Sequence, residues 1–418
     1  MSASLPNLAI NADRLWRDII ETARFGGTPK GGVRRLTLSE EDRQVRDWYR
    51  AALEEAGCTV TVDGLGNMFA VRPGRDASKA PLGIGSHLDT QPTGGKFDGV
   101  LGALAALEVV RTLNDAGIVT DTPICVCNWT NEEGSRFAPA MLGSGGYAGD
   151  MTVEELLART DAQGVSVGEA LDAIGYRGDE PVGAQKLSGF LEVHIEQGPI
   201  LEAEGKTIGV VEHGQGIIWY EGRIVGFASH AGSTPMRLRK DALAALSEIV
   251  LAVEALALEL GPNAVGTIGD VVVDTPSRNV IAGDLTFPVE FRTPDADILQ
   301  KLHQGLMAKV EEIAARRKVE IKLDTIWRKE PTHFAPAMIA AVRGAAEGLG
   351  LSHMPVVSGA GHDAFHLATI VPTAMIFVPC KDGVSHNELE DATPSDCAAG
   401  ANVLLHAVLA VAGTAPAS

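Results

Sequence analysis

Two short apolar segments, each ending next to residue types that bind metals, constrain the fold of this chain more than any other feature. Pro81 to Ser86 ends at His87, and Ile124 to Trp129 is followed within a few residues by the pair Glu132 and Glu133. Apolar runs of this length are typical of strands that are buried on both faces. Between them, residues 100–113 have the Ala- and Leu-rich pattern of a helix. This alternation predicts an α/β core with a mostly parallel sheet, whose ligands lie at the carboxyl ends of the strands.

The segment 212–327 has a different pattern. Its apolar periodicity predicts the order β-α-β-β-α-β, the ferredoxin-like arrangement of a four-stranded sheet with two helices on one face. Because 418 residues exceed a usual single core, we expect two domains. These are an α/β catalytic domain of residues 1–211 and 328–418 and an inserted α+β domain of residues 212–327. The expected elements of the insert are strands at Ile217–Ala228, Ala264–Val273, Asp284–Arg292 and Val319–Ile326 and helices at Arg239–Leu258 and Ala296–Arg316.

Glycines at 205, 209, 214 and 216 flank the entry to the insert and could form a hinge. We expect the insert to close over the catalytic domain as a lid. Its sheet edge and helical face are also expected to form the interface of a homodimer, because two-fold dimers are the commonest oligomers.

Charge and composition exclude several classes of partner. A net charge of −19 argues against a nucleic-acid partner, because phosphate binding relies on clustered Lys and Arg. We see no apolar run long enough to span a membrane, and Met1 to Asp13 lacks the pattern of a secretory signal. The odd number of cysteines, without a spacing framework, predicts reduced thiols in a cytoplasmic protein. These are Cys58, Cys125, Cys127, Cys380 and Cys397. We interpret Cys125 and Cys127 as small buried core residues rather than as a metal or redox site.

The metal-binding residue types occur in a combination that is more informative than any member. His87 and Asp89 lie two apart, so an extended segment points them the same way. Asp98 follows Gly94 and Gly95 in a loop where a carboxylate could bridge two metals. Taken singly, a histidine at a strand end is more often structural, an aspartate in a Gly-rich turn is usually a turn former, and an adjacent Glu pair is usually solvated. Together they predict a two-metal site, and nitrogen and oxygen ligands suit zinc, manganese, cobalt or nickel.

These motifs together resemble a known family. They are similar to the zinc-dependent amidohydrolases related to aminoacylases and carboxypeptidases, and above all to their ureido branch of N-carbamoyl-L-amino acid hydrolases, β-ureidopropionases and allantoate amidohydrolases. The resemblance runs from about Arg14 to Asp396. The stretches that carry it are Gly31–Leu38, Gly85–Thr90, Trp129–Phe137, Met141–Ser144, His194–Pro199, Ser229–Pro235 and Ser358–Asp363.

The resemblance implies a set of metal ligands and a catalytic base. Two divalent ions per subunit are expected, and Glu132 is expected to be the general base and then the acid. Asp89 would orient His87, and a histidine at position 194 favours the ureido branch because peptidase relatives usually have a carboxylate there. The implied ligands are His87 and His194 for one metal, Glu133 and His386 for the other, and Asp98 as the bridge.

The resemblance also implies a substrate site. His230 would stabilise the oxyanion, often across the dimer interface, and Asn279 and Arg292 would bind the substrate carboxylate. Gln197 and the loop of Gly359, Ala360 and Gly361 would contact the ureido or carboxylate groups. Without the resemblance, Arg292 would be read as a solvated strand end and Asn279 as a turn former. His362 could support the metal site from behind its ligands.

The implied activity is hydrolysis of the ureido C–N bond of an N-carbamoyl-L-amino acid or N-carbamoyl-β-alanine, giving the amino acid, carbon dioxide and ammonia. The partner is therefore a small ureido acid. Three alternatives stay open: an allantoate amidohydrolase with the same metals, a hydrolase of N-acyl amino acids or dipeptides, and a binding protein without catalytic activity.

Overall fold

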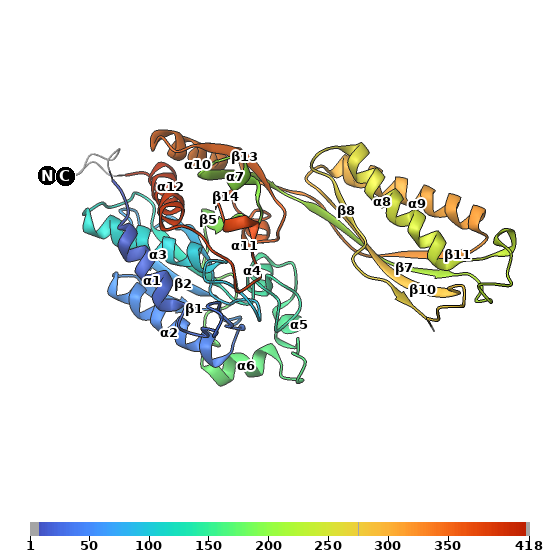
Figure 1. Ribbon diagram of the computed structural model, residues 1–418. Coiled ribbons are helices and arrows are strands. Elements are labelled where there is room, and N and C mark those ends of the chain that lie inside the picture. Colours follow the sequence, from blue (N-terminus) through green and yellow to red (C-terminus); the bar gives the residue numbers. More distant parts are fainter. Residues whose placement is uncertain (1–7, 275, 415–418) are drawn as a thin grey trace. The chain divides into compact units, whose positions relative to one another are not determined.

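The computed structural model describes residues 8–274 and 276–414, and it divides into two compact units (Figure 1). Unit 1 comprises Met1–Glu212 and His333–Ser418, and unit 2 comprises His213–Thr332. The sequence-based ranges for these were 1–211 with 328–418, and 212–327. The expectation about a secretory signal rests partly on residues 1–7, which lie outside the described residues.

The sheet of unit 1 has a parallel centre and antiparallel edges. Its order is β1-β2-β4-β3-β5-β14-β6-β12, and β13 pairs with β6. The strands β4, β3, β5 and β14 are parallel, whereas β1, β2 and β6 pair antiparallel with their neighbours. The expected parallel sheet is therefore its central part. The bounds are β1 Thr59–Val62, β2 Met68–Arg72, β3 Leu82–His87, β4 Ile124–Trp129, β5 Gly189–Ile195, β6 Ile208–Gly214, β12 Thr332–His333, β13 His353–Ser358 and β14 Thr373–Val378.

Helices cover both faces of this sheet. Gly400 of α12 packs against Val193 of β5, while the neighbouring Glu192 accepts a hydrogen bond from the backbone N–H of Ala364 in α11. Since successive residues of a strand point to opposite faces, α12 and α11 lie on opposite sides of β5. The helices are α1 Ala12–Thr22, α2 Glu40–Glu55, α3 Val100–Asp115, α4 Leu142–Ala148, α5 Val153–Leu157, α6 Val167–Ile174, α7 Ile200–Ala203, α10 Pro336–Gly348, α11 Asp363–Leu367 and α12 Pro394–Ala412.

One helix corrects the membrane expectation. By length and composition alone, α12, with 19 residues, is long and apolar enough to span a bilayer, contrary to the expectation that no such segment exists. In this structure more than half of its residues are buried, and it contacts α3, α10, β5 and β14. It is therefore a core helix of unit 1.

Unit 2 is an antiparallel sheet with two helices on one face (Figure 1). The sheet order is β11-β7-β10-β8, with β9 also paired to β10, and the helices α8 and α9 pack on each other. This is the strand order of the β-α-β-β-α-β motif. The bounds are β7 Gly216–Val225, α8 Ala242–Leu260, β8 Val265–Thr267, β9 Val272–Val273, β10 Asp284–Thr293, α9 Ala296–Arg317 and β11 Glu320–Lys329.

The second strand of unit 2 is interrupted, so the expectation of one strand over Ala264–Val273 was wrong. Gly269 lies between β8 and β9, and Asp270 accepts a hydrogen bond from the backbone N–H of Val271. Glycine weakens a strand, and the local aspartate bond competes with the ladder. Both short pieces still pair with β10.

Candidate metal centre

Three parallel strands deliver most of the predicted metal ligands to one edge of the sheet. His87 is the last residue of β3, His194 lies near the end of β5, and Glu132 and Glu133 follow β4. Because these strands are parallel and adjacent, their carboxyl ends lie together. Asp98 comes from the loop that precedes α3.

Gly99 allows the Asp98 loop to approach His87. The backbone N–H of Val100 donates to the carbonyl of Asp98 over 2.7 Å, which closes a three-residue γ-turn with Gly99 at its centre. Gly99 has φ 66° and ψ −45°, a conformation that residues with a side chain rarely adopt. A Cβ atom at this position would overlap the His87 ring. Only glycine therefore fits between the two predicted ligands without displacement.

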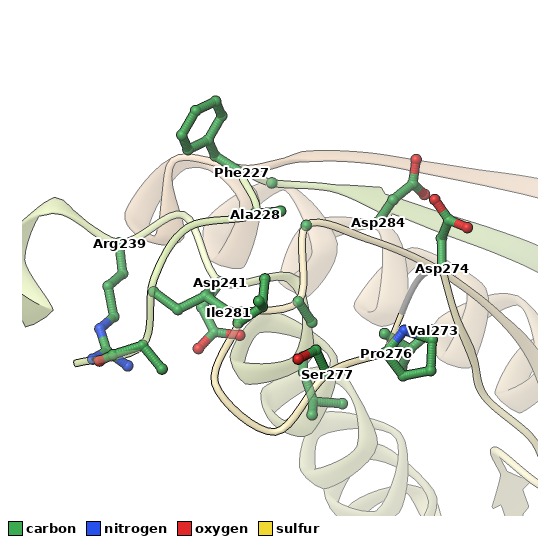
Figure 2. Close-up of a pocket in the computed structure, with 16 residues that line it drawn as sticks. Phe227, Ala228, Arg239, Asp241, Val273, Asp274, Pro276, Ser277, Ile281 and Asp284 are labelled. Atoms are coloured by element: carbon green, nitrogen blue, oxygen red, sulfur yellow. The ribbon is translucent and has the colours of Figure 1, made fainter. Parts of the chain in front are cut away.

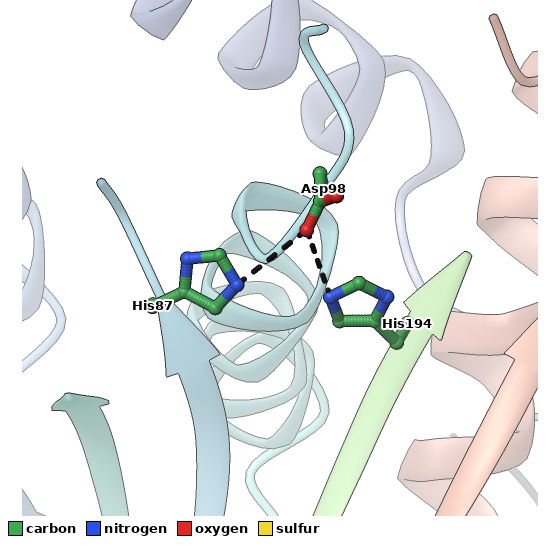
Figure 3. A group of neighbouring side chains, drawn as sticks. All are labelled: His87, Asp98 and His194. Carbon is green, nitrogen blue, oxygen red and sulfur yellow. Dashed lines mark ion pairs between the residues drawn. The ribbon is translucent and has the colours of Figure 1, made fainter. Parts of the chain in front are cut away.

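The Asp98 carboxylate faces two groups of side chains that could bind a metal. Its Oδ1 lies 3.5 Å from His87 Nε2 and 3.2 Å from His194 Nε2 (Figure 3). Its Oδ2 lies 3.5 Å from His386 Nε2, which in turn is 3.3 Å from Glu133 Oε2. Within each of these groups the ligand atoms all lie within 4.8 Å of one another. Asp98 thus presents one oxygen to each group, as a bridging carboxylate would.

The orientation of the histidines fits a bound cation. Nδ1 of His87 lies 3.0 Å from the carbonyl of Asp89, and Nδ1 of His194 lies 2.9 Å from the carbonyl of Ile195. Since a carbonyl can only accept, each Nδ1 carries the proton and each Nε2 has a free lone pair for a ligand or a donor. The Nε2 of His194 accepts the backbone N–H of Gly99 over 3.0 Å. His87 Nε2 is buried and has no hydrogen-bond partner in the described part of the chain. Burial alone would lower the pKa of His87, but the carboxylates of Glu132 and Asp98 raise it well above its usual value. The site therefore favours a positive charge at this nitrogen, which a divalent metal would supply.

Glu132 lies beside these donors. Its Oε2 is 3.4 Å from His87 Nε2. Burial, together with the nearby carboxylates of Asp363 and Glu133, raises the pKa of Glu132 well above its usual value. A carboxylate whose pKa is raised is a stronger base than an ordinary glutamate, as a proton acceptor requires.

Asp89 contacts the Glu132–Glu133 pair as well as His87. Its two carboxylate oxygens accept the backbone N–H groups of Glu132 and Glu133, each over 3.3 Å. Its Oδ1 lies 3.7 Å from His87 Nδ1, whereas the backbone carbonyl oxygen of Asp89 lies only 3.0 Å from the same atom. The side chain of Asp89 therefore fixes the turn that carries the two glutamates, and its backbone gives the closer contact to His87.

Gln197 contacts this centre, and the loop of Gly359 and Ala360 leads to His362 beside it. Gln197 Nε2 donates to Asp98 Oδ2 over 2.8 Å. The hydroxyl of Ser358 donates to the carbonyl of Ala360, and the same loop ends at His362, whose ring lies 4.5 Å from the His194 ring. Burial lowers the pKa of His362 well below its usual value, so this ring is neutral.

Three residues at the centre were missed by sequence reasoning. Gln91 binds both oxygens of Glu133, through its backbone N–H at 3.0 Å and its Nε2 at 2.7 Å. Ser385 donates to Asp98 Oδ2 over 2.8 Å, and the buried Glu390 contacts the same loop. Burial, together with the charge of Asp98, raises the pKa of Glu390 to about 7. The proximity of Ser385 and Glu390 to His386 in the sequence was the only available signal.

Unit 2 contains the other predicted residues, and two of them lie on paired segments. His230 forms a β-bridge with Val280, and the backbone N–H of Ala231 donates to the carbonyl of Asn279 over 2.8 Å. His230 Nδ1 accepts the backbone N–H groups of Gly232 and Ser233 at 3.0 and 3.1 Å. In a neutral ring the proton then lies on Nε2, which makes that atom a hydrogen-bond donor.

Arg292 lies on β10 and is held by Glu290. Its Nε and Nη2 donate to the Glu290 carboxylate over 2.6 and 3.0 Å. Trp219 of the adjacent strand β7 donates from its Nε1 to the same carboxylate. Arg292 is therefore fixed within a hydrogen-bonded group and is not a solvated strand end.

A pocket of about 470 Å³ lies in unit 2, next to the segment that carries His230 (Figure 2). Its lining includes Phe227, Arg239, Asp241 and Ser277. None of the predicted metal ligands is among its lining residues.

Comparisons with known proteins identify the family. The sequence profile of peptidase family M20/M25/M40 matches residues 83–410. A protein of Rhizobium meliloti named N-carbamoyl-L-amino-acid amidohydrolase is 50% identical over 412 residues, 99% of both chains. A ureidoglycolate hydrolase of Oryza sativa is 34% identical and covers 94% of this chain and 84% of its own. The crystal structure of an amidase of the hydantoinase/carbamoylase family from Burkholderia multivorans is 52% identical, has a TM-score of 0.95 and covers 97% of this chain and 98% of its own. The chain therefore belongs to peptidase family M20/M25/M40.

Proposed function

We propose that this protein hydrolyses the carbamoyl C–N bond of N-carbamoyl-L-amino acids, giving the free amino acid, carbon dioxide and ammonia. The observation that carries the proposal is the Asp98 carboxylate, which faces two groups of metal-ligand atoms with Glu132 alongside. The relatives named as amidohydrolases, which match this chain over nearly its full length, support the choice of an amide-type C–N bond.

The enzymes of this family are metal-dependent, and we propose two divalent ions in this chain. His87 and His194 would hold one, Glu133 and His386 the other, with Asp98 between them. Zinc is the first candidate, and manganese, cobalt and nickel suit the same nitrogen and oxygen donors. When bound, such ions lower the pKa of water and polarise a carbonyl group.

Glu132 is proposed as the proton carrier. It takes a proton from the attacking water and later delivers it to the leaving nitrogen. Its buried position, next to His87, keeps bulk water from competing for this proton. Asp89 keeps Glu132 in place through the backbone bond described above.

His230 is proposed as the donor to the oxyanion. Its Nδ1 is occupied by two backbone N–H groups, so its Nε2 carries the proton that such a donor needs. A well-placed donor of this kind contributes about 3–4 kcal/mol to transition-state stabilisation.

The substrate carboxylate is proposed to bind Arg292 and Asn279, and Gln197, Gly359 and Ala360 are proposed to contact the ureido group. Arginine suits a carboxylate because its planar fork makes two parallel hydrogen bonds. On this proposal unit 2 acts as a lid, because its residues must reach a substrate held at the metals of unit 1.

A homodimer formed through unit 2 is also proposed. Large apolar side chains that are more than half exposed are concentrated there, with only Leu389 in the described part of unit 1. Association of two copies of the chain would remove exposed apolar side chains of this size from water. We further propose a cytoplasmic location, since all five cysteines are buried and free. The exposed side chains in unit 2 are Phe227, Met236, Leu238, Leu251, Leu258, Val272 and Ile326.

Ammonia release provides the test of function. Protein stripped with EDTA and reloaded with Zn²⁺ or Mn²⁺ is assayed on N-carbamoyl-L-methionine, N-carbamoyl-β-alanine and allantoate. Metal-dependent release from N-carbamoyl-L-methionine is expected. Release from allantoate alone would replace the proposal with the allantoate alternative. Turnover of N-acetyl-L-methionine alone would make the enzyme an N-acyl amino acid hydrolase.

A further inference from the structure

The loop that carries Asp98 is held by a buried carboxylate with no role in the proposed chemistry. Oε1 of Glu390 accepts the backbone N–H groups of Phe97 and Asp98 over 2.9 and 3.1 Å. Glu390 is 5% exposed, so these bonds are shielded from water. Glu390 therefore fixes the backbone of Asp98.

The same glutamate also reaches the Asp98 side chain through Ser385. The Ser385 hydroxyl lies 2.8 Å from Asp98 Oδ2 and 3.1 Å from Glu390 Oε2. A hydroxyl has one proton and two lone pairs, so it can donate to only one of these oxygens at a time. Ser385 thus links the backbone anchor to the carboxylate oxygen that faces His386.

The loop that carries Asp98 packs closely against Glu390. A Cβ atom on Gly95 would overlap the Glu390 carboxylate, so the loop packs directly on it. The preceding Gly94 is bonded to Val33 in both directions, at 2.9 and 3.1 Å. In the same segment as Glu390, Glu388 accepts from Thr28 over 2.6 Å. Residues 385–390 therefore deliver His386 and at the same time hold the loop that delivers Asp98.

On the proposed role of Asp98 as the bridging ligand, we infer that Glu390 is a positioning residue, which together with Ser385 holds Asp98 between the two groups of ligands and thereby sets the metal affinity of the centre. It touches neither substrate nor the reacting atoms. Residues that orient metal ligands typically change metal affinity 10- to 100-fold when they are mutated.

Two substitutions separate position from charge. In Glu390→Gln the amide oxygen can keep both backbone bonds, and the amide N–H₂ can donate to Ser385, whose hydroxyl then donates to Asp98. In Glu390→Ala all of these bonds are lost. If the role is positional, the Gln variant keeps wild-type metal affinity to within about threefold and the Ala variant loses about 10- to 100-fold.

The experiment is a titration of the substrate-free protein with Zn²⁺ in competition with a chromogenic chelator. Asp391→Ala, which removes the exposed acidic side chain next in the sequence, is the control and should bind Zn²⁺ as the wild type does. Thermal unfolding of the metal-free variants checks that each one is folded. A Gln variant as weak as the Ala variant would show that the charge matters and would overturn the inference, as would an Ala variant with wild-type affinity. Since no substrate is present, this outcome is independent of whether N-carbamoyl amino acids are turned over.

Discussion

Gly99→Ala tests whether the approach of the Asp98 loop to His87 builds the metal centre. The new methyl group would overlap the His87 ring, and the alanine would have to keep φ 66° and ψ −45°. Either the ring or the loop must move. Both carry predicted ligands, so metal binding is the property that should suffer.

The expected loss of Zn²⁺ affinity follows from the backbone conformation of residue 99. A residue with a side chain in such a sparsely populated region costs about 1–3 kcal/mol. If the metal-free variant relaxes and the bound ion restores the native turn, this strain is taken from the binding free energy. Zn²⁺ affinity should then fall about 5- to 150-fold, because 1.4 kcal/mol is a factor of ten. Strain that the metal-free variant cannot relax lowers its free energy of unfolding instead.

The assay combines a Zn²⁺ competition titration with chemical unfolding of the metal-free protein. Gly344→Ala is the matched control, because Gly344 lies in α10 and a Cβ atom there has nothing within 4 Å. It should leave Zn²⁺ affinity unchanged and raise stability by about 0.5–1 kcal/mol, as alanine does in a helix. If Gly99→Ala matched the wild type in both affinity and stability, the steric argument would be refuted.

Four further outcomes are expected. Glu132→Gln should lower turnover by about 10²–10⁴-fold while Zn²⁺ stoichiometry is kept, and near-normal turnover would remove Glu132 as the base. Arg292→Ala should raise KM about 10- to 100-fold, since a hydrogen bond to a charged group is worth about 1.5–3 kcal/mol, and an unchanged KM would exclude Arg292 from carboxylate binding. EDTA should abolish ammonia release and Zn²⁺ or Mn²⁺ should restore it; activity that survives complete metal removal would contradict the two-metal proposal. Burial raises the pKa of Asp63 to about 6, so the folded state holds this proton more tightly than the unfolded chain does. The free energy of unfolding should therefore fall as pH rises from about 4 to 6, and urea unfolding should show a smaller fall in Asp63→Asn than in the wild type. A difference in stability between the two proteins that does not change with pH would contradict this.

Local pattern was a good guide where one periodicity dominated. The helix expected at Ser39 to Ala56 is α2, Glu40–Glu55, with Ser39 as the residue whose side chain caps it. The buried run before His87 is β3. The continuous strand at Ala264–Val273 was wrong because the Gly269–Asp270 break depends on a local bond that periodicity does not reveal.

The candidate site was predictable as a set of residues and only partly as an arrangement. His87, Asp98, Glu133, His194 and His386 were all proposed from the sequence, and the structure brings them into two groups that share Asp98. The roles of these residues, and those of His230, Asn279 and Arg292 in unit 2, are still predictions. The bonds of Arg292 to Glu290, two residues away on the same face of β10, could not be read from the sequence, because the pattern alone also allowed a solvated strand end.

The sequence by itself indicated the α/β character of the core, the β-α-β-β-α-β pattern of the insert and the chemically suitable side chains, because these depend on periodicity and residue type within short windows. Only the tertiary structure decided which oxygen of Asp98 faces which histidine, and that Glu390 and Ser385 hold it there. These residues come from segments almost 300 positions apart, and the distance between them is set by strand pairing and loop packing. A single sequence contains no record of that packing. The positions of the predicted ligands therefore depend on contacts that no local motif encodes.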